Sequence, residues 1–580
     1  MTLESILTLT GLIAIIIGLY SNRGRPAYWF VTVAVVLYLA GVLTLPEVLT
    51  GLTNEGVVTL ALLMIIAFLV QDSGLLEKPI EAMLNRANRN GAGFIGILAP
   101  VALVSGFLNN TPIVSMLVHP IRQWALDRGM APSQFLMPLS YAAIVGGTLT
   151  LIGTSTNLVV FGLVKDMELD HSLHLLSPAW VGLPLTVLFL IYYWFARHRL
   201  PNRTPADTRS QTVTHFQIPA RVTDAIAGQS VQDAQLRNLK HGYLYRLVRA
   251  TDEVLEVDSQ TRLHAGDQLV FLGAPQLVKE LSHLKGVEFS NHDTLEGAEP
   301  THLVEAVVPM GSSLIGKTAK EVGFRKRFGS VIVSIAHQTE QRFGKLGQYT
   351  LKAGDLLLLE TQNDHKTRIA ASDLMVLNRY HSGQPPQARR RSYLTLLAFP
   401  AMVLLGSALG FPLLDIALVF IALALLTGLA RPNQLPKGIE LELFAILVGA
   451  LALARAVDKT GLADAVVSLL NGLPLTPLWA LAAIFMLTWL MTELLTNNSA
   501  AALMLPFALP IGALYGLSVN QVAITVMIAA SASFVTPFGY QTNLMVLSAG
   551  NYKPIDYVKF GLPLVVISAV TTVTIVYLLL

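Results

Sequence analysis

The sequence has no cysteine, and only 13% of its 580 residues are charged. The absence of cysteine excludes disulfide bonds and thiolate metal ligands. A charged fraction this low, with 53% hydrophobic residues and a mean hydropathy of +0.57, falls outside the range of soluble globular proteins. The formal net charge of +3 gives no basis for a nucleic-acid partner. We therefore predict an integral membrane protein in contact with lipid.

The apolar segments are long enough for membrane helices and lack the ten-residue alternation of outer-membrane strands. They cover residues 5–20, 28–49, 57–70, 94–124, 135–164, 180–195, 393–409, 413–429, 441–456, 478–515, 522–549 and 558–580. The first segment has no basic leader and no small-residue cleavage site, so we expect a retained helix. The predicted fold class is an α-helical polytopic membrane protein.

One polar motif occurs twice within this apolar sequence. The first copy is Leu108-Asn109-Asn110-Thr111-Pro112 and the second is Leu495-Thr496-Asn497-Asn498-Ser499. An amide or hydroxyl without a partner is costly inside a membrane, so such clusters indicate a binding site. The first copy leaves about 14 residues on each side, too few for either arm to cross a hydrocarbon core of about 30 Å. We predict that each copy is the tip of a re-entrant helical hairpin.

A second kind of interruption follows each hairpin. The first is Gly153-Thr154-Ser155-Thr156-Asn157 and the second is Val535-Thr536-Pro537-Phe538-Gly539. Asn110 precedes Asn157 by 47 residues, and Asn498 precedes Asn543 by 45. Gly74 lies 36 residues before Asn110, and Gly461 lies 37 residues before Asn498. We predict two repeats, in which Asn110 corresponds to Asn498 and Asn157 to Asn543.

Clusters of basic residues predict the cytoplasmic edges of the membrane segments. The clusters are Arg23 with Arg25, Lys78 with Arg86 and Arg89, Arg197 with Arg199 and Arg203, Arg389 to Arg391, and Arg431 with Lys437. The number of membrane crossings between these clusters places them all on the cytoplasmic side only if each hairpin returns to the side of the membrane from which it entered. The repeats are then inverted, with the first hairpin open to the cytoplasm, the second open to the exterior and both termini outside. Inverted repeats with paired broken helices are typical of secondary transporters.

The four interruptions offer ligands for an anion and for a small cation. Half-helix N-termini present N–H groups and partial positive charge to an anion, while free carbonyls and Asn or Thr oxygens can hold sodium. No Lys or Arg lies within either tip, and Glu493 is the nearest charged residue. The alternative interpretation is that the Asn and Thr side chains only join helices together. The duplication at similar spacing favours the binding site.

Between the membrane halves, residues 1–200 and 389–580, the composition becomes that of a soluble domain. Runs of alternating polarity, such as 269–272 and 330–335, predict strands. The segment repeats internally, because Gly228 precedes Gly266 by 38 residues and Gly316 precedes Gly354 by the same number. We predict two α/β domains, at residues 201–290 and 291–388, on the cytoplasmic side.

The membrane part, about two thirds of the chain, resembles the SLC13-type divalent anion/sodium symporter (DASS) family. The resemblance lies in the two tip motifs and the breaks that follow them. It implies sodium as the coupling ion, a small anionic substrate, an elevator-type mechanism and a homodimer. The residues implied for substrate binding are Asn110, Thr111, Asn498, Ser499, Thr536 and Pro537. Those implied for sodium binding are Asn109, Asn110, Gly153, Thr154, Asn157, Asn497, Asn498, Val535 and Asn543. This chain departs from the family at Asn109 and Asn497, where Ser is usual, and at Ser499, where Thr is usual.

The soluble insert resembles two tandem TrkA-C (RCK_C) domains, the regulatory domains of potassium-channel and potassium-transporter subunits. The motifs are Leu314-Ile315-Gly316-Lys317-Thr318 and Lys352-Ala353-Gly354-Asp355. The resemblance implies a nucleotide or ion ligand and a regulatory role. A glycine-rich dinucleotide fingerprint after a strand is absent from the sequence.

The function predicted from the sequence is sodium-coupled symport of a divalent anion, with sulfate or a similar inorganic anion favoured over a C4-dicarboxylate. We expect a transporter and not an enzyme, in the inner membrane of a bacterium. Two other classes remain open. One is an ion channel gated by the insert, and the other is a sodium/proton antiporter, which needs a titrating carboxylate such as Glu493 in its core.

Overall fold

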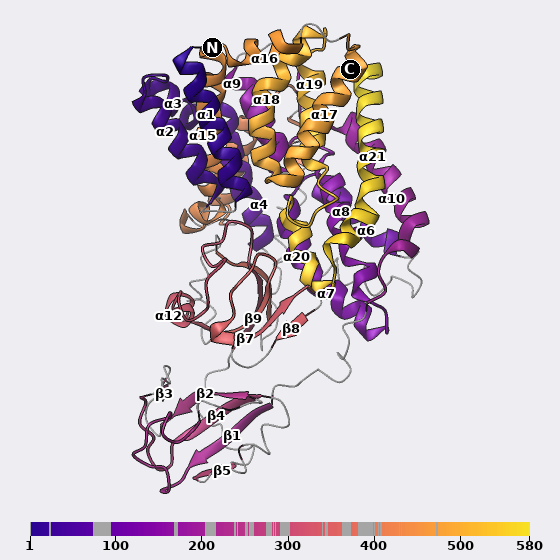
Figure 1. Ribbon diagram of the computed structural model, residues 1–580. Helices are drawn as coiled ribbons and strands as arrows, with labels where there is room; N and C mark the ends of the chain where they lie inside the picture. The colour runs from indigo at the N-terminus through magenta and orange to yellow at the C-terminus, as the bar shows by residue number, and fades with distance from the viewer. Residues whose placement is uncertain are drawn as a thin grey trace. The chain divides into compact units, whose positions relative to one another are not determined.

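The computed structural model describes residues 2–21, 25–72, 94–167, 172–203, most of 401–580 and, with gaps, the ordered parts of 216–289 and 302–380 (Figure 1). The chain forms two compact units. One contains Met1–Arg203, Pro309–Ser313 and Gly383–Leu580, and the other contains Thr204–Val308 and Leu314–Ser382. The first is the helical unit and the second is the soluble insert.

The first half of the helical unit contains nine α-helices among the described residues. They are α1 (Leu3–Tyr20), α2 (Pro26–Leu39), α3 (Leu45–Thr53), α4 (Glu55–Asp72), α6 (Ile95–Ser105), α7 (Asn110–Asp127), α8 (Leu136–Gly147), α9 (Ser155–Asp166) and α10 (Ala179–Ala196). The prediction of one segment over 28–49 is wrong, because α2 and α3 are separate. The chain turns between them at Gly41, whose φ of 77° favours glycine. A capping box of Thr44 and Glu47 then starts α3.

The second half contains eight described α-helices. They are α14 (Leu413–Leu426), α15 (Leu441–Lys459), α16 (Leu462–Leu470), α17 (Pro477–Leu494), α18 (Asn497–Leu514), α19 (Val519–Ser531), α20 (Gln541–Ala549) and α21 (Pro554–Leu579). The sequence prediction missed α16. The predicted segment at 393–409 and the proposed equivalence of Gly74 with Gly461 fall largely outside the described residues.

The arms of the first hairpin differ in length from the prediction. The first hairpin pairs α6, of 11 residues, with α7, of 18, and the second pairs α17 and α18, of 18 residues each. A helix of 18 residues rises about 27 Å. Both α17 and α18 are among the five described helices that are long and apolar enough to cross a membrane. The length argument for re-entrance concerns the first copy alone, where it holds for α6 but not for α7, and re-entrance stays a prediction that depends on where the tips lie.

The helical unit contains two groups of helices. One group packs α1, α2, α3 and α14 around α4 and α15, and the other contains α6 to α10 and α17 to α21 (Figure 1). They meet where α4 packs on α9 and α15 packs on α18. The contact between α4 and α9 is close, because a Cβ added to Gly56 would lie 2.6 Å from the Gly162 Cα. Small residues at this crossing allow the two backbones to approach.

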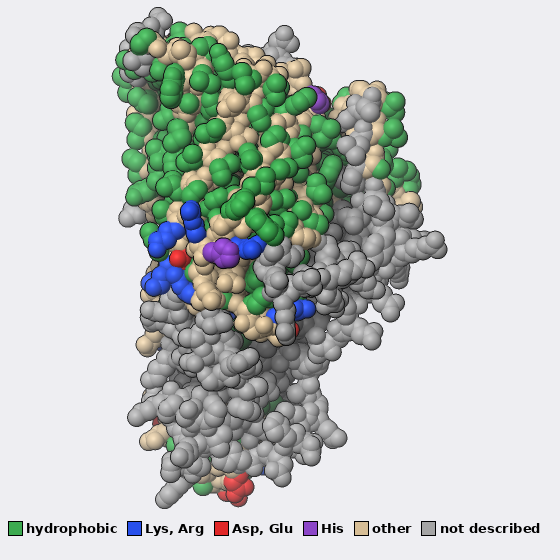
Figure 2. Space-filling model, turned by 90° about the vertical axis from the view of Figure 1, so that its right-hand side faces the viewer, with side chains coloured by type: hydrophobic (Ala, Val, Ile, Leu, Met, Phe, Trp, Pro, Cys, Tyr) green, Lys and Arg blue, Asp and Glu red, His purple; other side chains and the backbone are tan. Residues whose placement is uncertain are grey.

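The outer surface of the helical unit is hydrophobic. Figure 2 shows a broad apolar surface with Lys and Arg side chains gathered along its lower margin. Exposed apolar side chains on α10 include Trp180 at 57% and Phe195 at 74%, and those on α21 include Val566 and Val570. A soluble protein does not expose a continuous surface of this kind. The described surface is that of a protein in contact with lipid.

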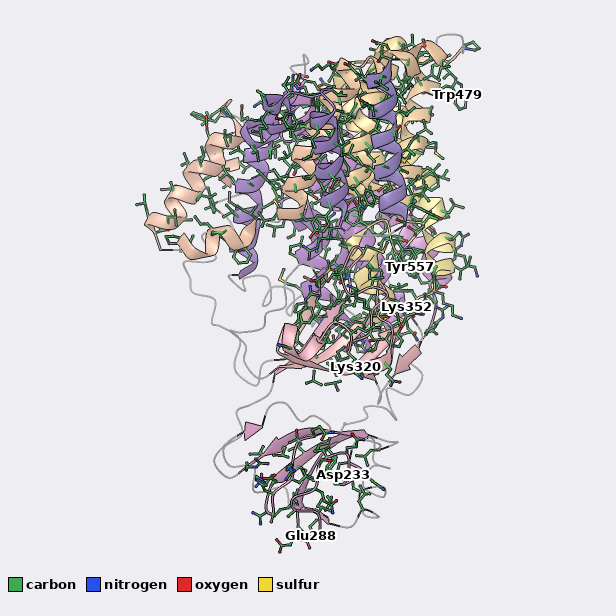
Figure 3. All side chains as sticks on the ribbon, turned by 60° about the vertical axis from the view of Figure 1, so that its left-hand side comes forward. Asp233, Glu288, Lys320, Lys352, Trp479 and Tyr557 are labelled. Atoms are coloured by element: carbon green, nitrogen blue, oxygen red, sulfur yellow. The ribbon has the colours of Figure 1, made fainter. Side chains whose placement is uncertain are left out.

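The insert contains two five-stranded sheets. The first contains β1 (Phe216–Val222), β2 (Gly242–Val248), β3 (Glu253–Val254), β4 (Gln268–Gly273) and β5 (Val287–Phe289), in the order β3-β2-β4-β1-β5. The second contains β6 (His302–Val307), β7 (Ser330–His337), β8 (Glu340–Arg342), β9 (Leu356–Thr361) and β10 (Met375–Tyr380), in the order β10-β6-β9-β7-β8. Read from opposite edges, the two orders are the same. Figure 3 labels Asp233 and Glu288 in the first copy and Lys320 and Lys352 in the second.

The backbone conformation explains why glycine occurs at the same position in both copies of the insert. Gly228 and Gly316 have φ of 86° and 77°, and each begins the same turn in its copy. The N–H of Gly228 donates to the Leu263 carbonyl at 2.7 Å, and that of Gly316 donates to the Leu351 carbonyl at 2.9 Å. A residue with a Cβ is strained at such φ values. The equal spacing in the sequence therefore reflects the same backbone turn used twice.

Candidate functional site

The polar motifs found in the sequence begin four half-helices. The first hairpin tip begins α7 at Asn110, and the second begins α18 at Asn497. The two breaks begin α9 at Ser155 and α20 at Gln541. The N-terminus of a helix carries unpaired N–H groups and partial positive charge. The site is therefore built from helix starts on four different helices.

Tyr540 connects these four helix starts. It caps α20, and its hydroxyl lies 2.5 Å from the Asn110 Nδ2 of α7. It lies 3.1 Å from the Oγ1 of Thr154, which is the N-cap residue of α9, and it also interacts with the Asn497 side chain of α18. Tyr540 and Asn110 are both buried. A single phenol thus holds both hairpin tips and both breaks together.

In the first tip, every polar group of Asn110 faces the protein. Its Oδ1 accepts a hydrogen bond from Ser105 Oγ at 2.6 Å, and its Nδ2 donates to Tyr540. The next residue, Thr111, is half-buried and donates from its hydroxyl to the Gln541 Oε1 at 3.2 Å. Asn109 precedes the helix as its N-cap and makes no side-chain capping bond.

In the second tip, the partners again come from the other half of the chain. Asn497 Nδ2 donates to Thr156 Oγ1 at 2.7 Å. Asn498 Oδ1 accepts from Ser155 Oγ and Thr156 Oγ1, each at 3.1 Å. Ser499 is fully buried, and its N–H and hydroxyl bond to Thr496, the N-cap of α18. The structure therefore gives Ser499 a capping role within its own helix.

The hydrogen bonds correct the pairing of the two tips. Ser105 Oγ donates to the Ala143 carbonyl, and Thr492 Oγ1 donates to the Ala530 carbonyl, each across 38 residues. Ser105 lies five residues before Asn110, as Thr492 lies five before Asn497. Asn110 therefore corresponds to Asn497 and not to Asn498. The sequence misled because Asn-Asn occurs in both tips, whereas the helix begins at the second Asn in one tip and at the first in the other.

The two breaks are closed in the same way by Asn157 and Asn543. Asn157 Nδ2 donates to the Thr150 carbonyl at 2.8 Å and to the Gly147 carbonyl at 3.4 Å. Asn543 Nδ2 donates to the carbonyls seven and ten residues before it, at 3.4 and 2.8 Å. The pairing of Asn157 with Asn543 thus agrees with their contacts. Both side chains are fully buried and shape the loops that end α8 and α19.

The side-chain oxygens of Asn157 and Asn543 differ in their hydrogen bonds. Asn543 Oδ1 accepts a hydrogen bond from Ser140 Oγ at 2.7 Å. Asn157 Oδ1 is buried, and none of the described residues gives it a hydrogen bond. A buried amide oxygen without a partner is unfavourable in a protein and is a common ligand for a hard cation.

Gly153 lies within a cluster of backbone oxygens. A Cβ added there would lie 2.5 Å from the Gly147 oxygen, 2.8 Å from the Ser105 oxygen and 3.0 Å from the Gly106 oxygen. Gly539 is placed similarly in the second half, where a Cβ would lie 2.4 Å from the Thr492 oxygen. Glycine is required at both positions because the backbones approach so closely. In the first half, three carbonyl oxygens surround one point of the break.

The second break is bound by a carboxylate from α17, and the first break has no counterpart among the described residues. Glu493 Oε1 accepts from the Val535 N–H at 2.9 Å, and its Oε2 accepts from the Thr536 N–H at 2.8 Å. The Trp489 indole also donates to it, at 3.3 Å. The Thr536 hydroxyl donates to the Glu493 carbonyl at 3.3 Å, and in the first half the Thr150 hydroxyl donates to the Gly106 carbonyl. Glu493 therefore holds the loop that contains Val535, Thr536 and the buried Pro537.

The structure brings nearly all the predicted site residues together, but sequence reasoning missed Tyr540, Thr156 and Ser105. Tyr540 precedes Asn543 by three residues, as Thr154 precedes Asn157, so an alignment of the two breaks would have found it. Tyr557 is a further support, because its hydroxyl donates to the Asn543 carbonyl at 2.8 Å (Figure 3). Ser105 carried no signal of its own in the sequence.

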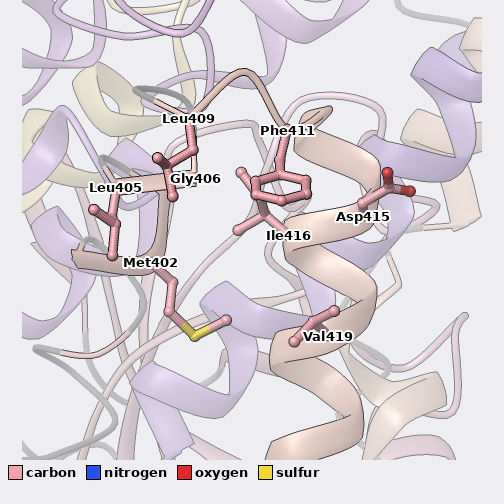
Figure 4. Close-up of a pocket in the computed structure, with 8 residues that line it drawn as sticks. All are labelled: Met402, Leu405, Gly406, Leu409, Phe411, Asp415, Ile416 and Val419. Atoms are coloured by element: carbon pink, nitrogen blue, oxygen red, sulfur yellow. The ribbon is translucent and has the colours of Figure 1, made fainter.

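A separate cavity of about 270 Å³ lies beside α14 and is lined by Met402, Leu405, Gly406, Leu409, Phe411, Asp415, Ile416 and Val419 (Figure 4). Its lining is almost wholly apolar, and Asp415 is exposed. An anion site requires hydrogen-bond donors, which these side chains do not provide. This cavity is therefore not the site of the predicted chemistry.

The apolar outer surface, the membrane-length helices and the four buried helix starts together define a multi-pass membrane transporter. The model of the citrate transporter family (CitMHS) matches residues 12–509, and the chain belongs to this family. The family lies in the same permease superfamily as the SLC13-type symporters. The class of protein predicted from the sequence is therefore confirmed.

Three relatives describe the range of the family. A Chlamydomonas reinhardtii protein named "Putative sulfur deprivation response regulator" is 33% identical, with 93% of this chain and 96% of the relative aligned. Sodium/sulfate cotransporter 1 of the same alga is 23% identical over 90% of this chain and 83% of the relative. Sodium-dependent high-affinity dicarboxylate transporter 3 of Caenorhabditis elegans is 27% identical over 22% of this chain and 26% of the relative. The chain thus belongs among transporters of the sodium/sulfate and dicarboxylate type.

Proposed function

We propose that this protein is a sodium-coupled symporter of a divalent anion, and that its principal substrate is sulfate or a similar inorganic anion. One observation carries the proposal: Tyr540, the N-cap residue of α20, bonds through its hydroxyl to residues at the starts of α7 and α9 and also interacts with Asn497 at the start of α18. Four partial positive charges meet there without a Lys or Arg side chain in either tip. Helix N-termini are suited to hold an anion that must also be released.

The anion would contact the half-buried residues at the edge of this network. Thr111 and Asn498 hold equivalent positions, directly after the first residues of α7 and α18. Asn498 Oδ1 already accepts two hydrogen bonds, so its Nδ2 is the side available to a ligand. The break residues Thr536 and Pro537 complete the same region in the second half.

Sodium would bind on the protein side of each tip. In the first half, the carbonyls around Gly153, the Asn110 Oδ1 and the Asn157 Oδ1 are oxygen ligands of the kind that a hard cation requires. In the second half, the corresponding groups are those of Asn497, Val535 and Asn543. A bound cation would neutralise part of the anion's charge, which couples the two binding events.

Sulfate is favoured over a C4-dicarboxylate by the names of long-matching relatives, which include sodium/sulfate cotransporters. The dicarboxylate alternative is favoured by the description of the family as citrate transporters and by one shorter match to a dicarboxylate transporter. Both substrates are divalent anions, so the same coupling would serve either.

We propose inverted repeats and an elevator-type mechanism in a homodimer. In support, the helices divide into two groups, of which only one contains both tips and both breaks. The groups meet at the close crossing of Gly56 with Gly162, and the proposed movement would occur along this contact. The group around α4 and α15 would form the fixed, dimeric part.

We propose that the insert is a pair of TrkA-C-like regulatory domains on the cytoplasmic side of a bacterial inner membrane. The duplicated strand order and the shared glycine turns support this assignment. A nucleotide or ion bound there would bias transport by its different affinity for the states of the cycle. Deleting residues 204–386 should preserve transport that depends on Asn110 but change its regulation, and complete loss in a folded deletion protein would contradict this.

The proposed function is tested by uptake of labelled sulfate and labelled succinate into proteoliposomes, with an inward gradient of sodium or of potassium. Sodium-driven, saturable sulfate uptake that is lost in Asn110→Ala is the expected result. Succinate uptake alone would retain the mechanism and overturn the substrate. Uptake of neither anion under any gradient would contradict the proposal.

A further inference from the structure

The two halves differ at the position that caps the second half-helix. Thr154 caps α9 and Tyr540 caps α20, each three residues before the Asn that closes its break. The matching contacts of Asn157 and Asn543 establish that these positions are equivalent. One half therefore places a small hydroxyl at this point, whereas the other places a phenol ring.

The phenol occupies the side-chain donor of Asn110 in the first tip. The Tyr540 hydroxyl lies 2.5 Å from Asn110 Nδ2, and Asn110 Oδ1 is held by Ser105 at 2.6 Å. Both polar atoms of the first tip's central amide thus have protein partners, and Asn110 has no exposed surface. The equivalent residue of the second tip, Asn497, donates to Thr156 and also interacts with Tyr540.

Thr111 at the start of α7 and Asn498 at the start of α18 offer side-chain donors to an anion. Thr111 offers a hydroxyl that now pairs with Gln541, and among the described residues none accepts from Asn498 Nδ2. A compact tetrahedral oxyanion can be held by such a single group of donors. A dicarboxylate carries two separate charged groups, and each needs its own donors. The donors that would serve the second carboxylate are those that Tyr540 occupies.

We propose that Tyr540 determines substrate specificity: its hydroxyl and ring close the space around Asn110, so that the site accepts a compact tetrahedral oxyanion and excludes a C4-dicarboxylate. This inference rests on the proposed anion symport and adds to it the residue that selects the anion. A ligand that leaves a buried polar group of the site unpaired binds weakly, so the partners of the site's polar groups decide which ligand is accepted. Removing Tyr540, the partner of Asn110, should therefore shift the preference from sulfate toward a dicarboxylate.

The test measures sodium-driven uptake of labelled sulfate into proteoliposomes and its inhibition by unlabelled sulfate, thiosulfate and succinate. Tyr540→Phe removes the hydroxyl and keeps the ring, and Tyr540→Thr installs the residue of the equivalent position. Tyr552→Phe is the matched control, because Tyr552 is also buried and its hydroxyl bonds only backbone groups, the Met137 N–H and the Ser133 carbonyl.

In wild type and in Tyr552→Phe, we expect succinate to inhibit weakly compared with sulfate. In Tyr540→Thr, the ratio of the two inhibition constants should shift toward succinate by about tenfold or more, and labelled succinate should enter. Tyr540→Phe should shift the ratio in the same direction by a smaller factor. If Tyr540→Thr does not fold, the ratio in Tyr540→Phe decides the matter.

Unchanged ratios in the Tyr540 variants, with sulfate transport retained, would overturn the role of Tyr540 and leave the proposed symport intact. Efficient succinate uptake by the wild type would overturn it as well, because Tyr540 would then exclude nothing. Absence of sodium-driven uptake of any tested anion by the wild type would instead contradict the proposed function itself.

Discussion

The carboxylate of Glu493 accepts the backbone N–H of Thr536 at 2.8 Å, and this contact joins the second hairpin to the second break. The first half has Gly106 at the corresponding position and therefore lacks such a contact, although Thr150 and Thr536 bond to the two carbonyls in the same way. The two halves of the site are thus alike in backbone and unlike in charge. Glu493 acts at this point as a fixed hydrogen-bond acceptor.

We expect Glu493→Ala to reduce sodium-driven uptake at least tenfold, because the Val535 and Thr536 N–H groups would lose their acceptor. Each unpaired buried donor costs about 1–3 kcal/mol. Glu493→Gln keeps one oxygen acceptor and should retain more activity than Glu493→Ala. The control is Asp415→Asn, an exposed carboxylate on α14. Equal uptake by wild type and Glu493→Ala at matched protein levels would disprove the positioning role.

Asn157→Ala should weaken sodium binding, since it removes the buried Oδ1 that has no partner among the described residues. The measurement is the rise in thermal unfolding temperature on adding sodium, with potassium as reference, in the purified protein. We expect a clear rise in wild type and a much smaller one in Asn157→Ala. Asp415→Asn, at an exposed position on α14, is the control and should keep the full rise. An undiminished sodium effect in Asn157→Ala would exclude this side chain as a ligand.

Gly153→Ala should abolish transport and lower stability by about 1–3 kcal/mol, because the new Cβ would lie 2.5 Å from the Gly147 oxygen. Gly96→Ala on α6 is the matched control, since a Cβ there would meet no atom within 4 Å. Alanine is also the better helix former, so this control should be neutral or slightly stabilising. Thermal unfolding and sulfate uptake of both variants provide the comparison. Normal transport by Gly153→Ala would mean that the oxygen cluster is not used.

In the insert, Asp267→Ala should destabilise the first sheet by about 2 kcal/mol. Asp267 is buried, accepts the His264 N–H at 2.8 Å and binds Arg249 through both oxygens at 3.0 and 3.1 Å. The hydrogen bonds with Asp267 raise the pKa of the Arg249 guanidinium. In limited proteolysis across a temperature series, the variant should be cleaved at a lower temperature than the wild type. Asp233→Asn, at an exposed position, should not change the cleavage.

Glu321 makes a pH-dependent contribution to the folding stability of the second copy in the insert. The Thr318 N–H donates to its carboxylate at 2.7 Å and lowers the pKa of Glu321. A carboxyl with a lowered pKa contributes stability above its unfolded pKa and loses it as the pH falls through the folded value. An NMR titration should therefore give Glu321 a midpoint below that of an ordinary glutamate, and Thr318→Pro, which removes the N–H, should restore the ordinary value. The effect on stability is small because the group is exposed to solvent.

Some elements could be predicted because their signals are local. The long apolar segments identified α1, α4, α10 and α21, since a membrane helix requires about 20 apolar residues in sequence. The glycines of the insert were equally informative, because a left-handed turn excludes most other residues. The break between α2 and α3 was missed because apolar residues run through it without interruption. The length of α7 was underestimated for the related reason that a tip motif does not mark where its arms end.

The sequence by itself determined that this is a multi-pass membrane protein, that it carries two polar tips and two breaks, and that Asn157 corresponds to Asn543. Those features depend on composition, on motif identity and on spacing along the chain. Only the tertiary structure decided that Asn110 corresponds to Asn497, that each tip bonds to the break of the other half, and that Tyr540 joins all four helix starts. These relationships depend on hydrogen bonds between residues more than 300 positions apart, and a spacing rule cannot locate partners that only folding brings together.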